Sequence, residues 1–181
     1  MRMTLWKKVI AYLISVPARI KGVKFGRNSY IGPFYDLDPK MRGVTLRDNV
    51  MIGKNSWLDI PLVSKNGKIV IGDGTQIGRN AVMSAVKRIE IGKKCLLSYN
   101  VSLIDHDHKF AKDISPMNSG LTEGQEITIG DDCFIGAHSF ILKGVKLGKN
   151  CVVGAGSVVR EPFPDYSVVA GNPAKLIRRL E

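Results

Sequence analysis

Residues 127–159 read ITIGDDCFIGAHSFILKGVKLGKNCVVGAGSVV, and within this stretch an aliphatic residue returns at every sixth position. The positions that carry this period are Ile129, Ile135, Ile141, Leu147, Val153 and Val159. An α-helix repeats at about 3.6 residues and a strand at about two, so neither element alone explains a strict period of six. The period indicates a chain that turns after each hexapeptide and stacks its turns on one another.

The same period extends toward the N-terminus, through Ile71, Ile77 and Met83 and again through Ile91, Leu97 and Leu103. An aliphatic or Phe residue is followed by Gly ten times between Phe25 and Gly154. Strands this short cannot bury themselves, so successive coils must stack. We therefore expect an all-β fold, a left-handed parallel β-helix. It should have about six coils, beginning near Phe25, Leu46, Ile71, Ile91, Ile129 and Leu147.

A second inward position lies four residues after the aliphatic residue and holds a small or β-branched side chain. We assign to it Thr75, Ala81, Val101, Ser139, Val145 and Ser157. The three cysteines, Cys95, Cys133 and Cys151, occupy the same position, which predicts stacked and reduced core thiols. An odd number of cysteines without a CxxC pair argues against disulfides and against a zinc site. Reduced thiols favour a reducing compartment, and we expect a cytoplasmic protein.

A chain of 181 residues with 44% hydrophobic and 24% charged content suits one repeat domain with capping ends. The formal net charge of +11 favours anionic partners such as a phosphorylated small molecule. No nucleic-acid motif accompanies that charge, so we expect no nucleic-acid partner. No apolar run approaches the roughly 20 residues of a membrane span.

Residues 1–24 precede the repeat and are predicted to form an N-terminal cap, with a short helix that ends near Pro17. The alternative is an amphipathic helix lying on a membrane surface, because basic residues surround Trp6 and Leu13. Those basic residues are Lys7, Lys8, Arg19, Lys21 and Lys24.

Three interruptions of the period predict loops, and loops of a solenoid often carry its function. Two are short, at Pro33–Gly43 and Val63–Lys68, and the longest is an extruded loop at 109–126. Asp105-His106-Asp107-His108 stands at the root of the long loop. A neutral imidazole can accept a hydroxyl proton near neutral pH and a carboxylate can fix its tautomer, so this segment is a candidate for general-base chemistry.

The segment from Ile127 to Arg178 resembles the C-terminal half of the hexapeptide acyltransferases, the group that contains galactoside, maltose and xenobiotic acetyltransferases. The most specific matches are IGAHSFILKGVKLG, GAGSVV and AGNPAKLIR, and the repeat covers about 25–178. The resemblance implies a domain at 25–178 that uses acetyl-CoA as acyl donor without a metal. It also implies a homotrimer with active sites between subunits.

In that family a His at the start of the loop is the general base. An ungapped match of Val101-Ser102-Leu103 puts this role on His108, with His106 as second choice and Asp105 as the group that orients the imidazole. The resemblance places Ala137 and Ala155 along the pantetheine arm of the donor. It places Lys175 and Arg178 near the phosphates. Several relatives have Thr-Lys where this chain has Arg160-Glu161, which moves a positive charge by one residue to Arg160.

The Asp-His-x-His root resembles enzymes that O-acetylate surface polysaccharides or their precursors, and we expect acetyl transfer to a sugar hydroxyl. The rival enzymes are nucleotide-sugar N-acetyltransferases and xenobiotic acetyltransferases. A γ-type carbonic anhydrase would use the same helix to hold zinc, but His106, His108 and His138 lack the expected H-x4-H pair. A non-catalytic β-helix serving only in assembly is the remaining alternative.

Overall fold

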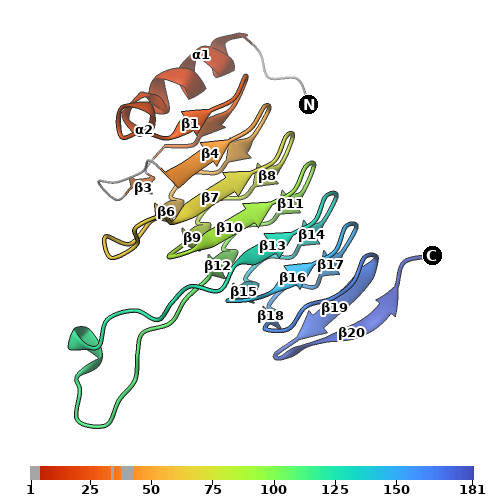
Figure 1. Cartoon of the computed structure of the whole chain (residues 1–181). Coiled ribbons are helices and arrows are strands. Elements are labelled where there is room, and N and C mark those ends of the chain that lie inside the picture. Colours follow the sequence, from red (N-terminus) through yellow and green to blue (C-terminus); the bar gives the residue numbers. More distant parts are fainter. Residues whose placement is uncertain (1–4, 34, 38–42) are drawn as a thin grey trace.

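Each hexapeptide forms one short strand and one turn, and three hexapeptides complete a coil (Figure 1). The structure is a computed structural model, and it describes residues 5–33, 35–37 and 43–181. Successive coils stack through parallel strand pairs, which build a left-handed parallel β-helix with three faces. The predicted fold class is confirmed.

The three faces are three sheets whose strands follow one another from coil to coil. The first sheet contains β1 (Lys24–Phe25), β4 (Val44–Leu46), β7 (Lys68–Ile71), β10 (Arg88–Ile91), β13 (Ile127–Ile129) and β16 (Lys146–Leu147). The second contains β2 (Tyr30–Ile31), β5 (Met51–Ile52), β8 (Gln76–Ile77), β11 (Leu96–Leu97), β14 (Phe134–Ile135), β17 (Val152–Val153), β19 (Ser167–Gly171) and β20 (Ala174–Arg179). The third contains β3 (Asp36–Leu37), β6 (Trp57–Asp59), β9 (Val82–Ser84), β12 (Ser102–Ile104), β15 (Phe140–Leu142) and β18 (Val158–Val159).

The aliphatic residue of each hexapeptide faces the interior, and its neighbour on the strand faces outward. In β11, Leu97 is fully buried while Leu96 is exposed. Leu97 is in register with Ile77 on one side and Ile135 on the other, so equivalent side chains form columns. The predicted coil starts are confirmed, because each lies on a strand of the first sheet.

The second inward position is also confirmed, since all six residues assigned to it are buried. The three cysteines are free and buried in one column. The thiol of Cys95 donates to the carbonyl of Gly130 at 3.1 Å, and that of Cys133 donates to Gly148 at 3.1 Å. Each cysteine therefore links its own coil to the next one. Hydrogen bonds with the neighbouring thiols, together with burial, raise the pKa of Cys133, which favours its neutral form.

The turns between the second and third sheets need a residue with positive φ, and short polar side chains supply it. Asn80, Asn100 and His138 have φ values of 57°, 57° and 60° in successive coils. Asparagine tolerates this left-handed conformation better than most residues do. The amide of Asn80 donates to Asn100 at 2.7 Å, and the amide of Asn100 lies 3.2 Å from Nε2 of His138. His138 thus has a place in a polar column at this corner.

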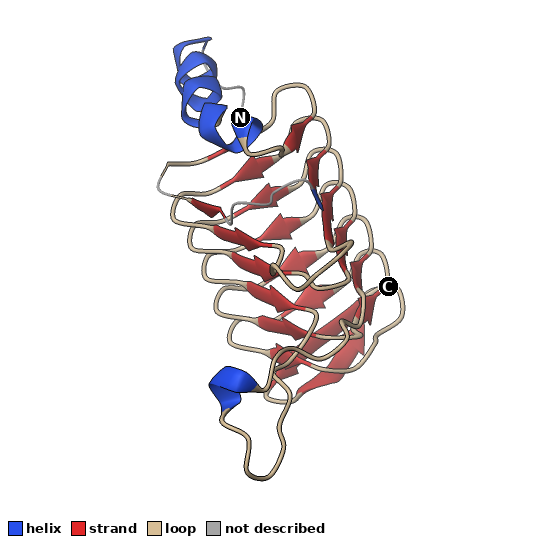
Figure 2. Ribbon diagram, turned by 60° about the vertical axis from the view of Figure 1, so that its left-hand side comes forward, coloured by secondary structure: helices blue, strands red, loops and turns tan. Residues whose placement is uncertain are grey.

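The N-terminal helices α1 (Leu5–Ile14) and α2 (Val16–Ile20) cover the open end of the first coil (Figures 1 and 2). The buried hydroxyl of Ser15 donates to Ala11 at 2.8 Å and accepts from the backbone N–H of Ile31 in β2 at 3.1 Å. The cap thereby satisfies a backbone group on an edge strand that has no further coil to pair with.

The predicted helix end near Pro17 was wrong in detail. The first helix ends at Ile14, and Pro17 lies in the first turn of α2. Proline is tolerated there because the first backbone N–H groups of a helix have no partner within it.

The longest interruption is the extruded loop, which leaves after β12 and returns at β13 (Figures 1 and 2). A short 3-10 helix, η2 (Pro116–Asn118), lies in its outer part. Of the interruption predicted at 33–43, residues 34 and 38–42 lie outside the described residues. Among the described helices, none combines the length and apolarity that crossing a bilayer requires.

Candidate active site

Asp105 anchors the point where the extruded loop leaves the solenoid. Its side chain is fully buried. Its carboxylate accepts three backbone N–H groups from the corner of the preceding coil, those of Val86, Lys87 and Arg88, at 2.7 to 2.8 Å. Burial opposes ionisation of Asp105, but these bonds and one from His106 outweigh it and hold the pKa of the carboxyl below its usual value. The carboxylate is therefore a fixed negative charge at the loop root.

His106 is held by that charge. Its Nδ1 lies 2.9 Å from Oδ1 of Asp105, and its side chain is only 9% exposed. An imidazole whose Nδ1 donates to a carboxylate keeps Nε2 as the proton acceptor. The structure thus brings together Asp105 and His106, two of the three predicted catalytic residues.

His108 lies two residues further out, on an ordered stem. The chain leaving the solenoid and the chain returning to it form an antiparallel ladder, in which His108 is bridged to Leu121. The backbone N–H of Lys109 donates to Gly120 at 2.9 Å, and that of Thr122 donates to Asp107 at 2.8 Å. His108 is exposed on this stem, so its imidazole is accessible while its backbone is fixed.

The stem is also fastened to the next coil. The ammonium group of Lys143, in the turn after β15, forms an ion pair with Asp107. In the same turn, the N–H of Gly144 donates to the carbonyl of Gln125 at 3.0 Å. The loop root is consequently bound to the coils on both sides of it.

Gly124 permits the close approach of the returning chain, and the sequence pattern did not single it out. A Cβ atom at Gly124 would lie 2.7 Å from both the backbone N and the Cβ of Lys87, and 3.1 Å from Oδ2 of Asp105. A larger side chain would push the stem away from the anchored carboxylate. The available signal was a lone Gly near the end of the loop without the aliphatic neighbour that marks coil glycines.

The residues matched to the pantetheine arm lie at a different corner. Ala137 follows β14 and Ala155 follows β17, so both lie between the second and third sheets. They belong to adjacent coils, and the N–H of Gly156 donates to the carbonyl of Ala137 at 2.8 Å. Ala155 is exposed and Ala137 is half-buried. The two alanines thus form part of one column with accessible backbone.

The predicted phosphate contacts lie toward the C-terminal end of the solenoid. Arg160 follows β18, at the same corner as the loop root but two coils further along. Lys175, in β20, forms a 3.0 Å ion pair with Glu161, beside Arg160. Arg178 lies opposite Val168 in the hairpin of β19 and β20. All three basic residues are exposed.

Within one chain these groups do not converge on one point. The loop root and Arg160 lie along one edge of the third sheet, and Ala137 and Ala155 lie along its other edge. The strands β12, β15 and β18 separate them.

His138 belongs to the alanine edge, where its ring meets Tyr99 in an edge-to-face contact at 5.3 Å between centroids. It therefore lies across the third sheet from the loop root. In the part of the chain that the structure describes, no three His, Cys, Asp or Glu residues form a group that could hold a metal ion.

These features define a class of protein: a hexapeptide-repeat β-helix with histidines at the root of a long extruded loop. A family model described as the hexapeptide repeat of succinyl-transferase matches residues 68–104 and 126–161. The galactoside O-acetyltransferase of Escherichia coli is 32% identical over 130 residues, which cover 71% of this chain and 63% of that protein.

A hexapeptide-repeat acetyltransferase from Vibrio cholerae is 31% identical, with a TM-score of 0.57 over 72% of this chain and 73% of that one. That protein has also been solved with acetyl coenzyme A. The chain therefore belongs to the hexapeptide-repeat acetyltransferase family.

The fold extends beyond these matches. A point mutant of AntD, an N-acyltransferase from Bacillus cereus, solved with dTDP and coenzyme A, gives a TM-score of 0.73 over 92% of this chain and 89% of that one, at 21% identity. At this identity the likeness concerns the fold alone. The chain spans 38% of the length of one mycobacterial relative and 63% of the E. coli galactoside enzyme.

Proposed function

We propose that the chain transfers an acetyl group from acetyl-CoA to a hydroxyl of a sugar or polysaccharide precursor. The observation that carries the proposal is the loop root, where two histidines stand on a stem fastened to the coils before and after it. Family membership supports acetyl-CoA as the acyl donor, because relatives have been solved with coenzyme A or acetyl coenzyme A.

The reaction we propose needs one base and no acyl-enzyme. The base removes the proton of the acceptor hydroxyl, and the oxygen attacks the thioester carbonyl to give a tetrahedral oxyanion. A backbone N–H stabilises that oxyanion. The C–S bond then breaks, the sulfur of coenzyme A takes the proton from the imidazolium, and an O-acetyl ester is released.

We assign the base to His108, because its side chain is exposed and can reach an acceptor, while its backbone is fixed by the bridge to Leu121. His106 remains the second candidate, since Asp105 already fixes its tautomer. With His108 as base, the Asp105–His106 pair positions the stem from which His108 projects.

We further propose a homotrimer with active sites between subunits. The supporting observation is that the loop root and the alanine column lie on opposite edges of one sheet. A neighbouring copy would bring its alanine column and basic residues to the loop root of the first. We also propose a cytoplasmic location and a role in polysaccharide biosynthesis, consistent with three buried free thiols and a coenzyme A donor.

An acceptor screen tests the activity. The full chain is incubated with acetyl-CoA and a panel of sugars, nucleotide sugars and oligosaccharides, and products are read by thiol release and mass. We expect alkali-labile O-acetyl products from at least one saccharide. Amide products from amino-sugar nucleotides would favour the rival N-acetyltransferase, and no thiol release with any acceptor would contradict the proposal.

A further inference from the structure

One face of the N-terminal cap packs on the solenoid, and a second face of α1, which is apolar, stays exposed. Ala11 and Ser15 are buried against the first coil, and so is Ala18 in α2. Trp6, Val9, Ile10 and Leu13 recur at the spacing of one helix face and are all exposed. Exposure reaches 78% for Trp6 and 61% for Leu13, and Ile20 of α2 is 81% exposed. We call Trp6, Val9, Ile10 and Leu13 the outer stripe.

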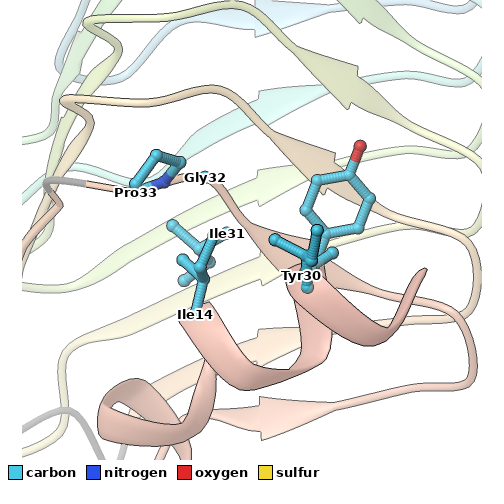
Figure 3. A pocket seen from close by; sticks show the side chains of 7 residues that line it. Ile14, Tyr30, Ile31, Gly32 and Pro33 are labelled. Carbon is cyan, nitrogen blue, oxygen red and sulfur yellow. The ribbon is translucent and has the colours of Figure 1, made fainter. Parts of the chain in front are cut away.

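An apolar groove lies between α1 and the first coil (Figure 3). Its lining includes Ile10 and Ile14 from α1 together with Tyr30, Ile31 and Pro33 from the first coil. Ile10 belongs both to the outer stripe and to this lining. Single exposed apolar residues are ordinary, but a connected apolar surface of this kind marks an interaction site.

The charge of residues 1–35 indicates the kind of surface that the outer stripe binds. Residues 1–35 contain no Asp or Glu and seven basic residues, namely Arg2, Lys7, Lys8, Arg19, Lys21, Lys24 and Arg27. The rest of the chain has 20 basic and 16 acidic residues, so 35 residues supply seven of the eleven net positive charges. Such a segment is attracted to an anionic surface.

We propose that the cap docks on an anionic phospholipid membrane, with the outer stripe inserted at the interface. An interfacial helix buries an apolar face among lipid headgroups while basic residues contact anionic lipid, and Trp favours this depth. A second copy of the chain would bring two acid-free basic segments together, and their charges would repel. A nucleic acid would neutralise the charge but would leave the outer stripe in water.

Vesicle sedimentation tests the proposal with the full chain. Vesicles of phosphatidylcholine are compared with vesicles that contain about 30% phosphatidylglycerol, at low and high salt. We expect sedimentation with the anionic vesicles, weakened by salt, and little with phosphatidylcholine alone. Wild-type protein that stays in the supernatant with anionic vesicles at low salt would overturn the proposal.

A double variant, Trp6→Asp with Leu13→Asp, removes the apolar contact and should lower the partition coefficient at least about tenfold. Leu62→Asp is the matched control, because Leu62 is 63% exposed in the turn after β6, away from the cap. The control should bind as the wild type does. A double variant that still binds anionic vesicles like the wild type would contradict the inserted stripe. So would one that dissociates a wild-type oligomer in sedimentation velocity, since the stripe would then join two copies.

Tryptophan fluorescence gives a second readout that does not depend on the folding of the double variant. The chain has two tryptophans, so Trp57→Phe leaves Trp6 as the sole emitter. Its emission should shift to the blue when anionic vesicles are added, because the indole leaves water. Unchanged emission at a saturating concentration of anionic lipid would contradict the proposal.

Discussion

Side chains are buried in the coils and largely exposed in the outer part of the extruded loop. In the coils, Leu97 and its equivalents are buried in columns that run from one coil to the next. In the outer loop, residues 110–119 are exposed or half-buried throughout, including Phe110 and Met117. Burial of this kind indicates that stability is concentrated in the coils. The loop can therefore carry exposed functional residues, provided that its root is held in place.

Removal of the outer loop tests whether this segment contributes to activity and not to stability. Lys109 and Gly120 are joined by a backbone hydrogen bond, so a Gly-Gly turn can replace residues 110–119. We expect an unchanged melting temperature and a loss of acetyl transfer of at least about 100-fold, because misplacement of reacting groups is that costly. Transfer at the wild-type rate would show that the outer loop takes no part in the reaction.

A cavity in a coil should lower the stability of the fold and leave acetyl transfer unchanged. Leu97→Ala should lower the free energy of unfolding by about 2–5 kcal/mol, with transfer per folded molecule unchanged. The control is Leu62→Ala, in which the same atoms are removed from a side chain that is 63% exposed. Denaturant titration of both variants checks this, and equal destabilisation by the two would contradict the assignment of stability to the columns.

Asp105 lies where the extruded loop leaves the coils, and Asp105→Asn should lower the stability of the fold. The pKa of this carboxyl is lower in the folded chain, so its charge adds stability above its unfolded pKa of about 3.9 and loses it as the pH falls through the folded pKa. We expect the variant to lose about 1–3 kcal/mol at neutral pH, and the difference from wild type to shrink below about pH 4.

Unfolding measured across this pH range checks the linkage. Asp107→Asn provides the comparison, because Asp107 is also at the root but about half exposed. A pH-independent difference between Asp105→Asn and wild type would show that the charge of Asp105 is not what holds the root.

The smallest effect should come from the ion pair of Lys143 with Asp107. Both side chains are at least a third exposed, so Lys143→Met should cost no more than about 1 kcal/mol, and less in high salt. A double-mutant cycle with Asp107→Asn isolates the pair. A coupling energy well above that range would mean that this contact, and not Asp105, is the main fastening of the stem.

The period of six predicted the coils because it is a local property of the sequence. Each aliphatic residue sets its own inward position, and the cysteines and small residues follow from the same register. The hydrogen bonds from residues 86–88 to Asp105 could not be predicted from this local period, because they join corners almost 20 residues apart. The lack of room for a side chain at Gly124, beside Lys87, was not predicted for the same reason.

The site was predictable in part. The interruption of the period located the loop root, and the proximity of Asp105 to His106 followed from their adjacency in sequence. The difference in exposure between His106 and His108 depends on the antiparallel ladder of the stem. The sequence of the loop has no periodicity from which this ladder could be predicted. The convergence that we propose between the loop root and the alanine column would require a second chain, because the two lie on opposite edges of one sheet. A pattern within one chain does not encode the distance between copies.

The most direct test of the account is kcat for His108→Ala beside His106→Ala, with coenzyme A affinity and melting temperature measured on the same preparations. We predict that His108→Ala lowers kcat by about 100-fold or more, as for the loss of a general base, with coenzyme A affinity nearly unchanged. His106→Ala should have the smaller effect. Full activity of His108→Ala with loss of activity in His106→Ala would contradict the assignment, and full activity of both would contradict catalysis at the loop root.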